Sequence, residues 1–595
     1  MILIALRRLA ALLPILFLHA APASAASRLF QPPEGFIAAK DLPEDFQARV
    51  RDLRFDRKDA FEGSVIHTTL DRKLFNLGND LHIVSRESTI RRRLLFREGE
   101  VITKDRLAET ERILRTEEFL SDAILSVQPG EGGECDVLVT TFDQWTLVPA
   151  IGISAQNLNP PDFYLLRWDR IRQSEWLWSA GLFESNLVGT GTKVGAAVRH
   201  TLERDIREIV ASNNNLTPQK LQVTAYAAWL SDGDSLLFSI GKPLLSRTDR
   251  YAFSVGLAAK EVSERIYFDA NHLDALPPDL AKDSAGAAHL LRIFNRVATQ
   301  EINASATRSF GSDLKLNAGP TFQFKDHYNI GGLGRADSAL LPFAPLPASA
   351  AAPEQRTDAL IGGAVGLYRY GFRTARNFRN LKWNESVETG WRLTSKAALN
   401  QEWLGAGDSD FRLSQEAQFT AFPMDAVYVN GSASWQSFLS PSGDLADGRA
   451  DALWESAWRE HPLTSTWLTA SWSGLFATPL SQQLTLGEIN GLAGYPSFYY
   501  AGQARFLATA EQRLFPEFEL LTMVPAFAAY VTAGNTFPAW RDFDPADLHY
   551  SLGLGLRLGR SKSTQKVVQH INVNFPLGDK YLKGPVVSIL ARKSL

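Results

Sequence analysis

From Trp145 to the end of the chain, hydrophobic and polar residues alternate with a period of two. One run of apolar positions consists of Leu221, Val223, Ala225, Ala227 and Trp229. Another consists of Leu552, Leu554, Leu556 and Leu558. Successive side chains of a strand point to opposite faces, so this pattern predicts strands with one apolar and one polar or small face. The alternation continues for about 450 residues, which favours one large β-structure and disfavours a soluble β-sandwich.

The N-terminus has the features of an export signal. Arg7 and Arg8 precede an apolar run, Leu9–Ala21, that is too short to span a bilayer. Ala23-Ser24-Ala25 has the small-x-small pattern of a cleavage site, so residues 1–25 are predicted to be a signal peptide. No later run is apolar enough for a transmembrane helix. An exported membrane protein without such helices must be a closed barrel, with lipid outside and a polar lumen.

Composition excludes several classes of function. The formal net charge of −3 gives no argument for a nucleic-acid partner. A single cysteine permits neither an internal disulfide nor a cysteine-based metal site. The chain has no G-x-S-x-G or H-E-x-x-H motif, so we expect no enzymatic activity, no cofactor and no metal. A Ser–His site assembled in the barrel wall is the alternative that one sequence leaves open.

A small α+β domain is predicted to precede the barrel. Residues 26–63 are interpreted as a lead segment, and residues 64–144 as the domain. A strand around Leu74–Ser85 is expected to lead into a helix at Arg86–Phe96, and Thr103 is a candidate N-cap of a second helix. Two strands follow, which gives the order β-α-α-β-β. The segment IRRRLLFREGEVITKDRLAETERILRTEEFLSDAILSV resembles a POTRA domain.

A glycine- and aromatic-rich stretch, Leu486–Arg513, carries the most specific motif. Its core is Gly491-Leu492-Ala493-Gly494-Tyr495, which resembles the conserved lumen loop of the BamA/TamA family of outer-membrane barrels, bacterial surface antigen type. The family typically has arginine where this chain has Ala493. The resemblance places Thr532, in the stretch Tyr530–Gly534, where the family has the aspartate that partners this arginine.

Further matches extend the resemblance over the predicted barrel, residues 145–595. The hairpin residues Glu184, Asn186, Gly189 and Gly191 resemble an early family hairpin. Five strand candidates follow the loop, as in the sixteen-stranded family barrel, so about sixteen strands are expected. Before the loop the alternation gives more candidates than this number allows, and we interpret some of them as broken or misread. In the first of them, Glu511 and Arg513 share a face, and Arg505 is a candidate substitute cation for Glu511.

The barrel seam is expected where the last strand meets the first. The last strand is predicted at Val586–Leu595, with Val586, Ile589 and Leu595 as seam residues. Its partner is expected near Trp145–Ser154 or Trp176–Asn186, because pairing there would remove an exposed sheet edge.

The resemblance implies a location and a function. The barrel would lie in the bacterial outer membrane, in contact with its lipid, and the POTRA domain would lie in the periplasm. It would assist insertion or translocation of proteins or lipids, and extended client polypeptides would pair with the POTRA edge strand. Periplasmic accessory proteins are further candidate partners. A passive pore and a dedicated transporter of one secreted protein are the alternatives.

Overall fold

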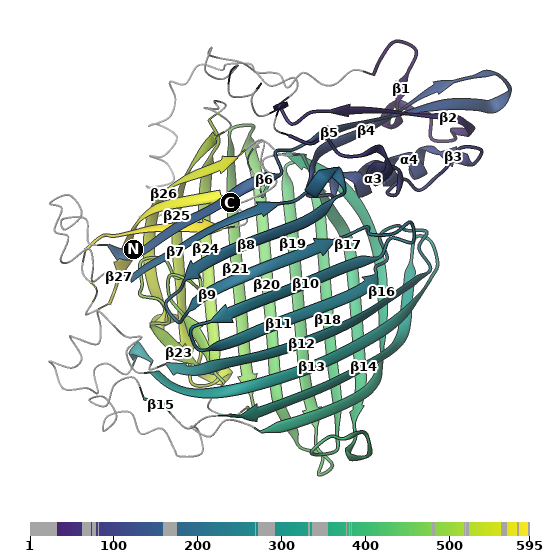
Figure 1. The fold of residues 1–595 in the computed structure, drawn as a ribbon. Helices are drawn as coiled ribbons and strands as arrows, with labels where there is room; N and C mark the ends of the chain where they lie inside the picture. Colours follow the sequence, from purple (N-terminus) through teal and green to yellow (C-terminus); the bar gives the residue numbers. More distant parts are fainter. Residues whose placement is uncertain are drawn as a thin grey trace.

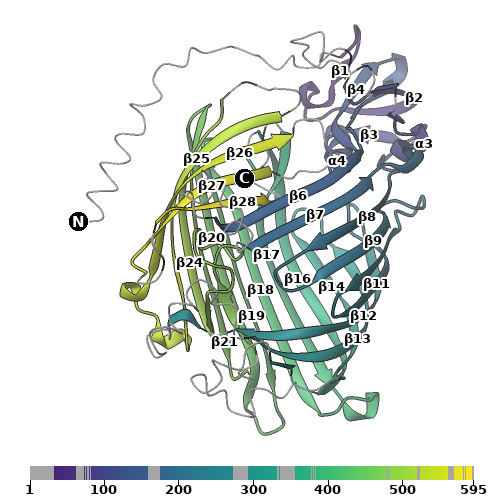
Figure 2. The same ribbon diagram turned by 60° about the vertical axis from the view of Figure 1, so that its left-hand side comes forward.

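The structure is a computed structural model in which the chain forms a large barrel with a small N-terminal domain at one end (Figures 1 and 2). It describes residues 32–61, 73, 76, 79–80, 82–158, 175–267, 269–271, 292–330, 334–335, 355–376, 378–379, 381, 384–478, 482–516, 518, 523–560, 568–579, 582 and 584–592. The predicted signal peptide and Leu595 therefore lie outside the described residues.

The barrel is a closed antiparallel sheet in which consecutive strands pair, and β28 pairs with β6 to close it. Its first half comprises β6 (Leu147–Leu158), β7 (Glu175–Glu184), β8 (Thr192–His200), β9 (Asp205–Asn213), β10 (Gln222–Leu230), β11 (Gly233–Lys242), β12 (Tyr251–Tyr267), β13 (Arg292–Phe310), β14 (Lys315–Asn329) and β15 (Gly334–Arg335). Its second half comprises β16 (Arg356–Arg376), β17 (Asn384–Asn400), β18 (Asp410–Met424), β19 (Val427–Leu439), β20 (Leu445–His461), β21 (Thr464–Phe476), β24 (Ala504–Leu514), β25 (Met523–Phe537), β26 (His549–Arg560), β27 (Val568–Leu577) and β28 (Val586–Arg592).

The expected number of about sixteen strands is too low. Within the described residues the barrel order contains twenty-one strands, and setting aside the two-residue β15 leaves twenty. All of the excess lies before the lumen loop, because the five strands that follow it, β24–β28, are those that the alternation predicted. A barrel widens with its strand number, so this lumen is broader than the resemblance implied.

The outer wall of the barrel is apolar, as the alternation predicted. Trp229, Leu236 and Leu554 are 53%, 58% and 58% exposed, and Leu554 lies on the face opposite to Arg557 of the same strand. Inward positions carry charged and amide side chains such as Glu511, Arg557 and Asn572. An exposed apolar band around a polar interior is typical of a transmembrane β-barrel.

Connections between consecutive antiparallel strands alternate between the two rims. The rim that carries the N-terminal domain, here the near rim, holds short turns such as those after β7, β9 and β11 (Figure 1). The hydrophilic breaks predicted at His272–Gly286, Asp326–Thr357 and Ser440–Gly448 join β12 to β13, β14 to β16 and β19 to β20. All three therefore belong to the opposite, far rim, although much of the first two lies outside the described residues.

The N-terminal domain is a five-stranded sheet in the order β1-β4-β5-β2-β3, with two helices packed on it. Its elements are β1 (Ile37–Ala38), β2 (Gln47–Lys58), α3 (Glu87–Arg91), β3 (Val101–Thr103), α4 (Lys104–Arg115), β4 (Leu120–Pro129) and β5 (Glu134–Asp143). Thr103 Oγ1 accepts a hydrogen bond from Arg106 N at 3.3 Å, so it caps α4 as predicted. Cys135 is buried in the core of this domain.

The predicted start of this domain was wrong. Its first long strand is β2, at Gln47–Lys58, inside the segment that we interpreted as a lead. Asn76, Asn79 and Asp80 are helical, where a strand was expected. β2 runs parallel to the buried strand β5, so Val50 and Leu53 face the core and the domain cannot begin at residue 64.

Among the described residues, none of the helices is both long and apolar enough to cross a membrane.

Candidate functional site: lumen loop, barrel seam and domain junction

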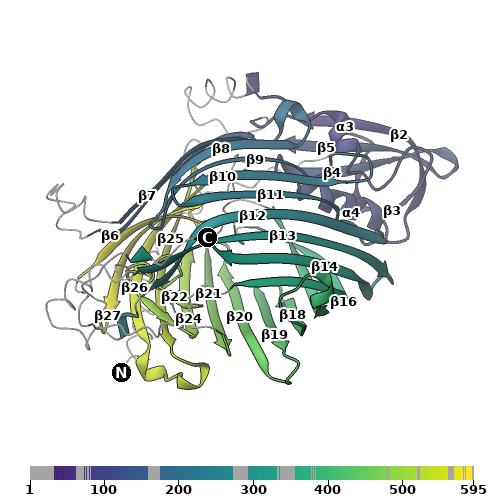
Figure 3. The ribbon, with the colours of Figure 1, turned by 60° about the horizontal axis from the view of Figure 1, so that its bottom comes forward.

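The stretch between β21 and β24 folds back into the barrel. Its ends pair as a separate two-stranded sheet, β22 (Leu484–Leu486) with β23 (Tyr500–Gly502), and β22 contacts β21, β24 and β25 (Figure 3). Residues 487–499 between these strands, here the lumen loop, include the fully buried Tyr495 and Tyr499. The contacts described below join the loop to β24–β28 and to the end of β12.

Glycines let the lumen loop approach the wall closely. Gly491 and Gly494 have φ values of 107° and 81°, which side-chain-bearing residues rarely adopt. A Cβ atom on Gly494 would lie 2.8 Å from Asn574 Cβ, and one on Gly491 would lie 2.6 Å from Leu507 Cδ2. Gly491 and Gly494 are therefore needed for two reasons: the backbone conformation disfavours a side chain, and the wall leaves no room for one.

A buried carboxylate ties the lumen loop to the last strand. Glu488 is 2% exposed, and its Oε1 accepts a hydrogen bond from Ser588 Oγ of β28 at 2.8 Å. Its Oε2 accepts one from Gly494 N. Ser588 Oγ in turn accepts from Asn574 Nδ2 at 3.1 Å. Both bonds lie in a buried site, where an unmade hydrogen bond is costly, so Glu488 links the motif turn to the barrel seam.

Aromatic side chains hold the rest of the loop. Tyr495 Oη donates to the carbonyls of Tyr550 and Leu577 at 3.1 and 3.2 Å. The ring of Phe498 stacks on Tyr267 with centroids 4.4 Å apart. Tyr267 ends β12, on a distant part of the wall, so the loop joins two sides of the barrel near its far rim.

Ala493 lies against β25. It packs with Ala528 and Tyr530, which point inward. Thr532 is on the same face, 3% exposed, and its Oγ1 has no hydrogen-bond partner in the described structure. Gly534 faces β22, at the start of the loop, because a Cβ there would lie 3.1 Å from Leu486 Cδ2. The described contacts do not join Ala493 to Thr532, so their proximity stays a prediction.

Glu511 has a different cationic partner from the one that we predicted. Glu511 Oε1 lies 3.3 Å from Arg513 Nε and 3.5 Å from Arg557 Nη2. Arg505, the expected substitute cation, instead donates through Nη1 to the carbonyl of Thr485 at 3.2 Å. It lies toward the opposite end of β24 from Glu511, so Arg557 on β26 takes the place that we predicted for Arg505.

We expect Ala493→Arg to destabilise the barrel. Arg557 already stands 5.6 Å above the ring of Tyr530, which Ala493 touches. A further guanidinium in this enclosed cluster would lack a carboxylate of its own, which costs several kcal/mol when buried. Adding Thr532→Asp supplies one and should recover much of the loss. The loss of the folded band on heating, followed on gels, measures both. Ala493→Met is the control for size, and equal losses for Met and Arg would refute the charge argument.

The barrel seam is weakly paired. Within the described part of the chain, β28 pairs with β6 at two positions, Val587 with Leu158 and Ile589 with Ala155, and the register shifts between them. β6 pairs with β7 at ten positions and β28 with β27 at seven. Val586 lies at the start of β28 opposite Asn574. Few ladder hydrogen bonds must therefore break to part β28 from β6.

The near-rim connection between β16 and β17 reaches into the lumen. Leu381 is 2% exposed and packs with Phe515, Val524 and Ala526, and a Cβ on Gly559 would lie 2.9 Å from Leu381 Cδ1. Phe378 meets the ring of Trp467 at 5.2 Å. These contacts hold the described residues of the connection against inward side chains of the wall near this rim.

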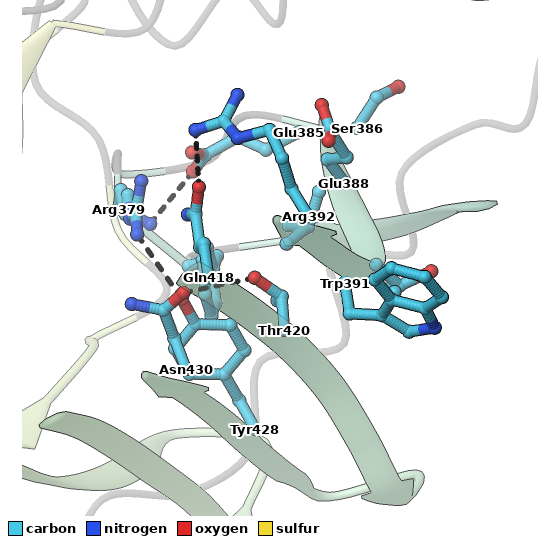
Figure 4. A pocket seen from close by; sticks show the side chains of 14 residues that line it. Arg379, Glu385, Ser386, Glu388, Trp391, Arg392, Gln418, Thr420, Tyr428 and Asn430 are labelled. Atoms are coloured by element: carbon cyan, nitrogen blue, oxygen red, sulfur yellow. Dashed lines mark hydrogen bonds between the residues drawn. The ribbon is translucent and has the colours of Figure 1, made fainter. Parts of the chain in front are cut away.

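A polar pocket of about 330 Å³ lies beside this connection, against the inner face of β17–β19 (Figure 4). Arg379 Nη2 donates to Tyr428 Oη at 3.2 Å, and Arg392 Nη2 donates to Gln418 Oε1 at 2.6 Å. Trp391 points away from this group in Figure 4. The guanidinium groups that line the pocket are therefore committed to wall residues. Within the described residues, no cluster of acidic, His or Cys side chains is arranged to hold a metal.

The early hairpin closes on itself through its polar motif residues. Glu184 Oε1 accepts a hydrogen bond from Asn186 N at 2.7 Å, and Asn186 Oδ1 accepts one from Gly191 N at 2.7 Å. Gly189 and Gly191 have φ values of 74° and 70°. These residues form the turn between β7 and β8 that their types predict.

The same turn binds the N-terminal domain. Asn186 Nδ2 donates to Ser85 Oγ at 2.9 Å, and the carbonyl of Gly189 accepts from Arg86 N and Thr89 Oγ1 at 2.9 and 2.8 Å. A Cβ on Gly189 would lie 2.8 Å from the carbonyl of Val84. The motif is therefore the junction of domain and barrel, a role that its sequence did not predict.

Helix α4 extends this junction across the near rim. Arg112 Nη2 donates to the carbonyl of Leu245, between β11 and β12, at 2.6 Å. Its guanidinium lies 4.3 Å above the ring of Phe372, an inward position of β16. Glu109 Oε1 accepts from Arg247 N at 3.2 Å. The domain thus covers part of the near-rim opening.

A buried acid lies behind the junction. Asp143 Oδ2 accepts hydrogen bonds from Ser85 N and Oγ at 2.7 and 2.8 Å, and His82 Nε2 is 4.0 Å away. Burial raises the pKa of Asp143 to about 6, and the bonds from Ser85 oppose this shift only in part.

This pKa predicts that the junction loses stability as the pH rises. The pKa of Asp143 is about 6 in the folded state and near 3.8 in the unfolded state, so the folded state binds the proton more tightly. The folded state therefore holds more protons between these values, so the contribution of Asp143 to stability is complete below pH 3.8 and falls by about 2–3 kcal/mol as the pH rises through 6. Pulse proteolysis of the N-terminal domain in urea at pH 5 and pH 7.5 measures this. In Asp143→Asn the pH difference should shrink, and an unchanged difference would contradict the assignment.

The sequence did not lead us to several residues of the loop, the seam and the junction. Glu488 could have been noticed, because it is the only acid among the glycines and aromatics at residues 487–500. Ser588, Asn574 and Ser85 gave no signal, because serine and asparagine are common on barrel walls and before helices.

Comparisons with known proteins give a consistent but distant likeness. No family profile and no curated protein matches the chain. Among solved structures, it is similar to CdiB from Acinetobacter baumannii, with a TM-score of 0.40, 9% identity, and coverage of 99% of this chain and 97% of that one. For BamA from Haemophilus ducreyi lacking POTRA domains 1–3, the TM-score is 0.35 and the identity 9%, with coverage of 91% and 84%.

A barrel protein described as an iron transporter has a similar TM-score. The FrpB iron transporter from Neisseria meningitidis has a TM-score of 0.35 and 9% identity, with coverage of 79% of this chain and 87% of that one. These TM-scores are low, so the fold is assigned from the strand pairing of this chain. The chain is a closed, membrane-facing antiparallel β-barrel with an N-terminal α+β domain, similar over most of its length to BamA and CdiB.

Proposed function

We propose that this chain is an outer-membrane barrel of the BamA/TamA type that assists the insertion or translocation of polypeptides. Its N-terminal domain would be a POTRA domain in the periplasm, and the near rim would be the periplasmic rim. The chemistry is non-covalent, so the chain would not be an enzyme. A protein client is preferred to a lipid client because the sheet of the domain offers a strand edge.

The coupling of the lumen loop to the barrel seam is the observation that carries this proposal. The seam has two paired positions, and Glu488 of the loop bonds to Ser588 on one of its two strands. A passive pore has no need of a weak closure, since an unpaired sheet edge in lipid is costly. A wall that parts to admit a client strand needs both a weak closure and an element that restores it.

The domain offers one sheet edge to a client. β4 is partly covered, because Glu111 Oε1 accepts a hydrogen bond from Leu125 N at 2.7 Å and Arg115 Nη2 donates to the carbonyl of Ala123 at 2.9 Å. On β2, only Gln47–Arg49 pair with β3. Beyond Val50, its outer edge has no neighbouring strand among the described residues. We infer that an extended client would pair along residues 52–58.

Two other functions make different predictions. A passive pore would lose only solute permeability when the protein is removed. A dedicated transporter would lose one secreted protein.

Depletion of the protein, followed by profiling of the outer membrane and the secreted proteins, separates these cases. Loss of a few barrel proteins would support the proposal, and either of the other outcomes would overturn it. A chain lacking residues 32–143 should fold as a barrel, because the core of the domain is separate, but should not complement the depletion.

A further inference from the structure

Strand β12 extends past its neighbours at the far rim. It has seventeen residues, whereas β8–β11 have nine or ten each. Its last pairing with β11 is Glu261 with Asp234, and residues 262–267 continue beyond this point, paired with residues 292–297 of β13. The segment formed by residues 262–267 and 269–271, here the far-rim strap, extends toward β23 (Figure 1).

Charged side chains fix the base of the strap to the short hairpins beside it. Arg265 Nη2 lies 3.4 Å from Asp232 Oδ2, in the turn between β10 and β11. Arg204, in the turn between β8 and β9, lies 3.6 Å from Asp232 through Nε and 3.6 Å from Glu203 through Nη2. The side chains of Arg204, Arg265 and Asp232 are 13%, 11% and 16% exposed. Separating them would leave poorly solvated charges unpaired, so the base stays with the β6 side of the seam.

The tip of the strap contacts the other side of the seam. Gln483, which precedes β22, accepts a hydrogen bond from Tyr267 N at 2.8 Å and donates one to the Tyr267 carbonyl at 3.0 Å. Asn271 Nδ2 donates to Asn535 Oδ1 of β25 at 3.0 Å, and Asn271 Oδ1 accepts from His549 Nε2 of β26 at 3.3 Å. In the barrel order the seam separates β8–β11 from β25 and β26, so the strap bridges it.

The tip is held less firmly than the base. Asn271 is exposed, so water can take over its hydrogen bonds when it leaves. The ring of Phe498, which stacks on Tyr267, belongs to a residue with a φ value of 57°, a conformation that is unfavourable for a bulky side chain. Release of the tip would let Phe498 leave this conformation. The contact that yields first is therefore the tip.

We propose that the far-rim strap is a second closure of the barrel seam. Its base remains on the short hairpins, and its tip holds the lumen loop, β25 and β26 against them. When the tip releases, the two described strand pairs between β28 and β6 are left to resist opening. The inference rests on the proposed opening of the seam and adds an element that keeps the seam closed at rest.

Pulsed EPR on the purified full-length chain in liposomes tests this inference. Spin labels are attached at Leu182→Cys on β7 and Leu554→Cys on β26, outward positions on opposite sides of the seam that are 54% and 58% exposed. Opening of the seam lengthens the distance between the labels. Asn271→Ala with Gln483→Ala removes two side chains that hold the tip and should raise the long-distance fraction about threefold. Gln482→Ala, an exposed neighbour of Gln483, is the matched control and should leave the fraction unchanged.

The outcomes separate the strap from the proposed function. Gln483→Glu keeps the acceptor for Tyr267 N and should give an intermediate long-distance fraction. Normal heat-modifiability on gels shows that each barrel is folded, and Cys135 is buried, so the labels attach at the introduced cysteines. A long-distance fraction that is present in wild type and unchanged in the tip variants, or raised equally in Gln482→Ala, would overturn the strap alone. A single short distance in wild type and in every variant would overturn the strap and the opening of the seam together.

Discussion

Replacing Glu488 by alanine is expected to release the lumen loop and to destabilise the barrel. The substitution leaves Ser588 Oγ and Gly494 N without their acceptor in a site where Glu488 is 2% exposed. Each buried donor left unsatisfied costs about 1–3 kcal/mol, so the loss of both should cost about 2–6 kcal/mol. The urea concentration at which the folded, heat-modifiable form disappears measures the loss.

Two further variants show whether the loss comes from this contact. Glu488→Gln keeps one acceptor oxygen and should cost less than alanine. Ser588→Ala should cost about 1 kcal/mol alone and little in the Glu488→Ala background, because the bond is already absent. If the two alanine substitutions act additively, Glu488 does not tie the loop to β28, and the coupling that we describe is absent.

Gly189→Ala is expected to detach the N-terminal domain while leaving the barrel folded. The φ value of 74° makes any side chain unfavourable by about 1–2 kcal/mol. A Cβ here would also lie 2.8 Å from the carbonyl of Val84 and 3.1 Å from Arg86 N, which are backbone atoms of the domain. Since the backbone cannot rotate aside, the contact should open and lose the bonds from Arg86 and Thr89.

The matched control for this variant is Gly578→Ala. Gly578 has a φ value of 85°, and a Cβ atom there would have no neighbour within 4 Å, so it shares the backbone strain and lacks the clash. Limited proteolysis between domain and barrel should be several-fold faster in Gly189→Ala than in Gly578→Ala. Equal cleavage rates would mean that the junction does not depend on this contact.

The sequence predicted the class of the fold well because alternation is a local property. The five strands after the lumen loop were found because leucines and glycines mark their two faces, as at residues 552–558. The number of strands was underestimated because the resemblance set it. A pair of strands with a short turn, such as β9 and β10, adds to the barrel without altering the local pattern.

The prediction of the lumen-loop glycines was also right because it depended on a local property of the chain. The motif glycines needed positive φ values, and their residue type alone indicates this. The partners of the loop could not be predicted, because Glu488 meets Ser588 only after 100 residues of intervening wall have closed the barrel. The start of the domain was misplaced for a related reason, since β2 is recognised as core only once it pairs with β5.

A disulfide across the barrel seam tests whether the wall must open between β6 and β28. Ala155→Cys with Ile589→Cys joins two residues that pair directly between β6 and β28. Directly opposed residues have Cα atoms about 4.5–5.5 Å apart, which suits a disulfide. The native Cys135 should not interfere, because burial raises the pKa of its thiol to about 11. Leu556→Cys with Ile571→Cys, a pair on the same wall away from the seam, is the control.

Both disulfide variants are compared, oxidised and reduced, for assembly of outer-membrane proteins in cells depleted of the wild-type chain. We expect the oxidised seam variant to be folded but inactive, its activity to return on reduction, and the control pair to be active in both states. Full activity of the oxidised seam variant would show that the wall does not open at this seam.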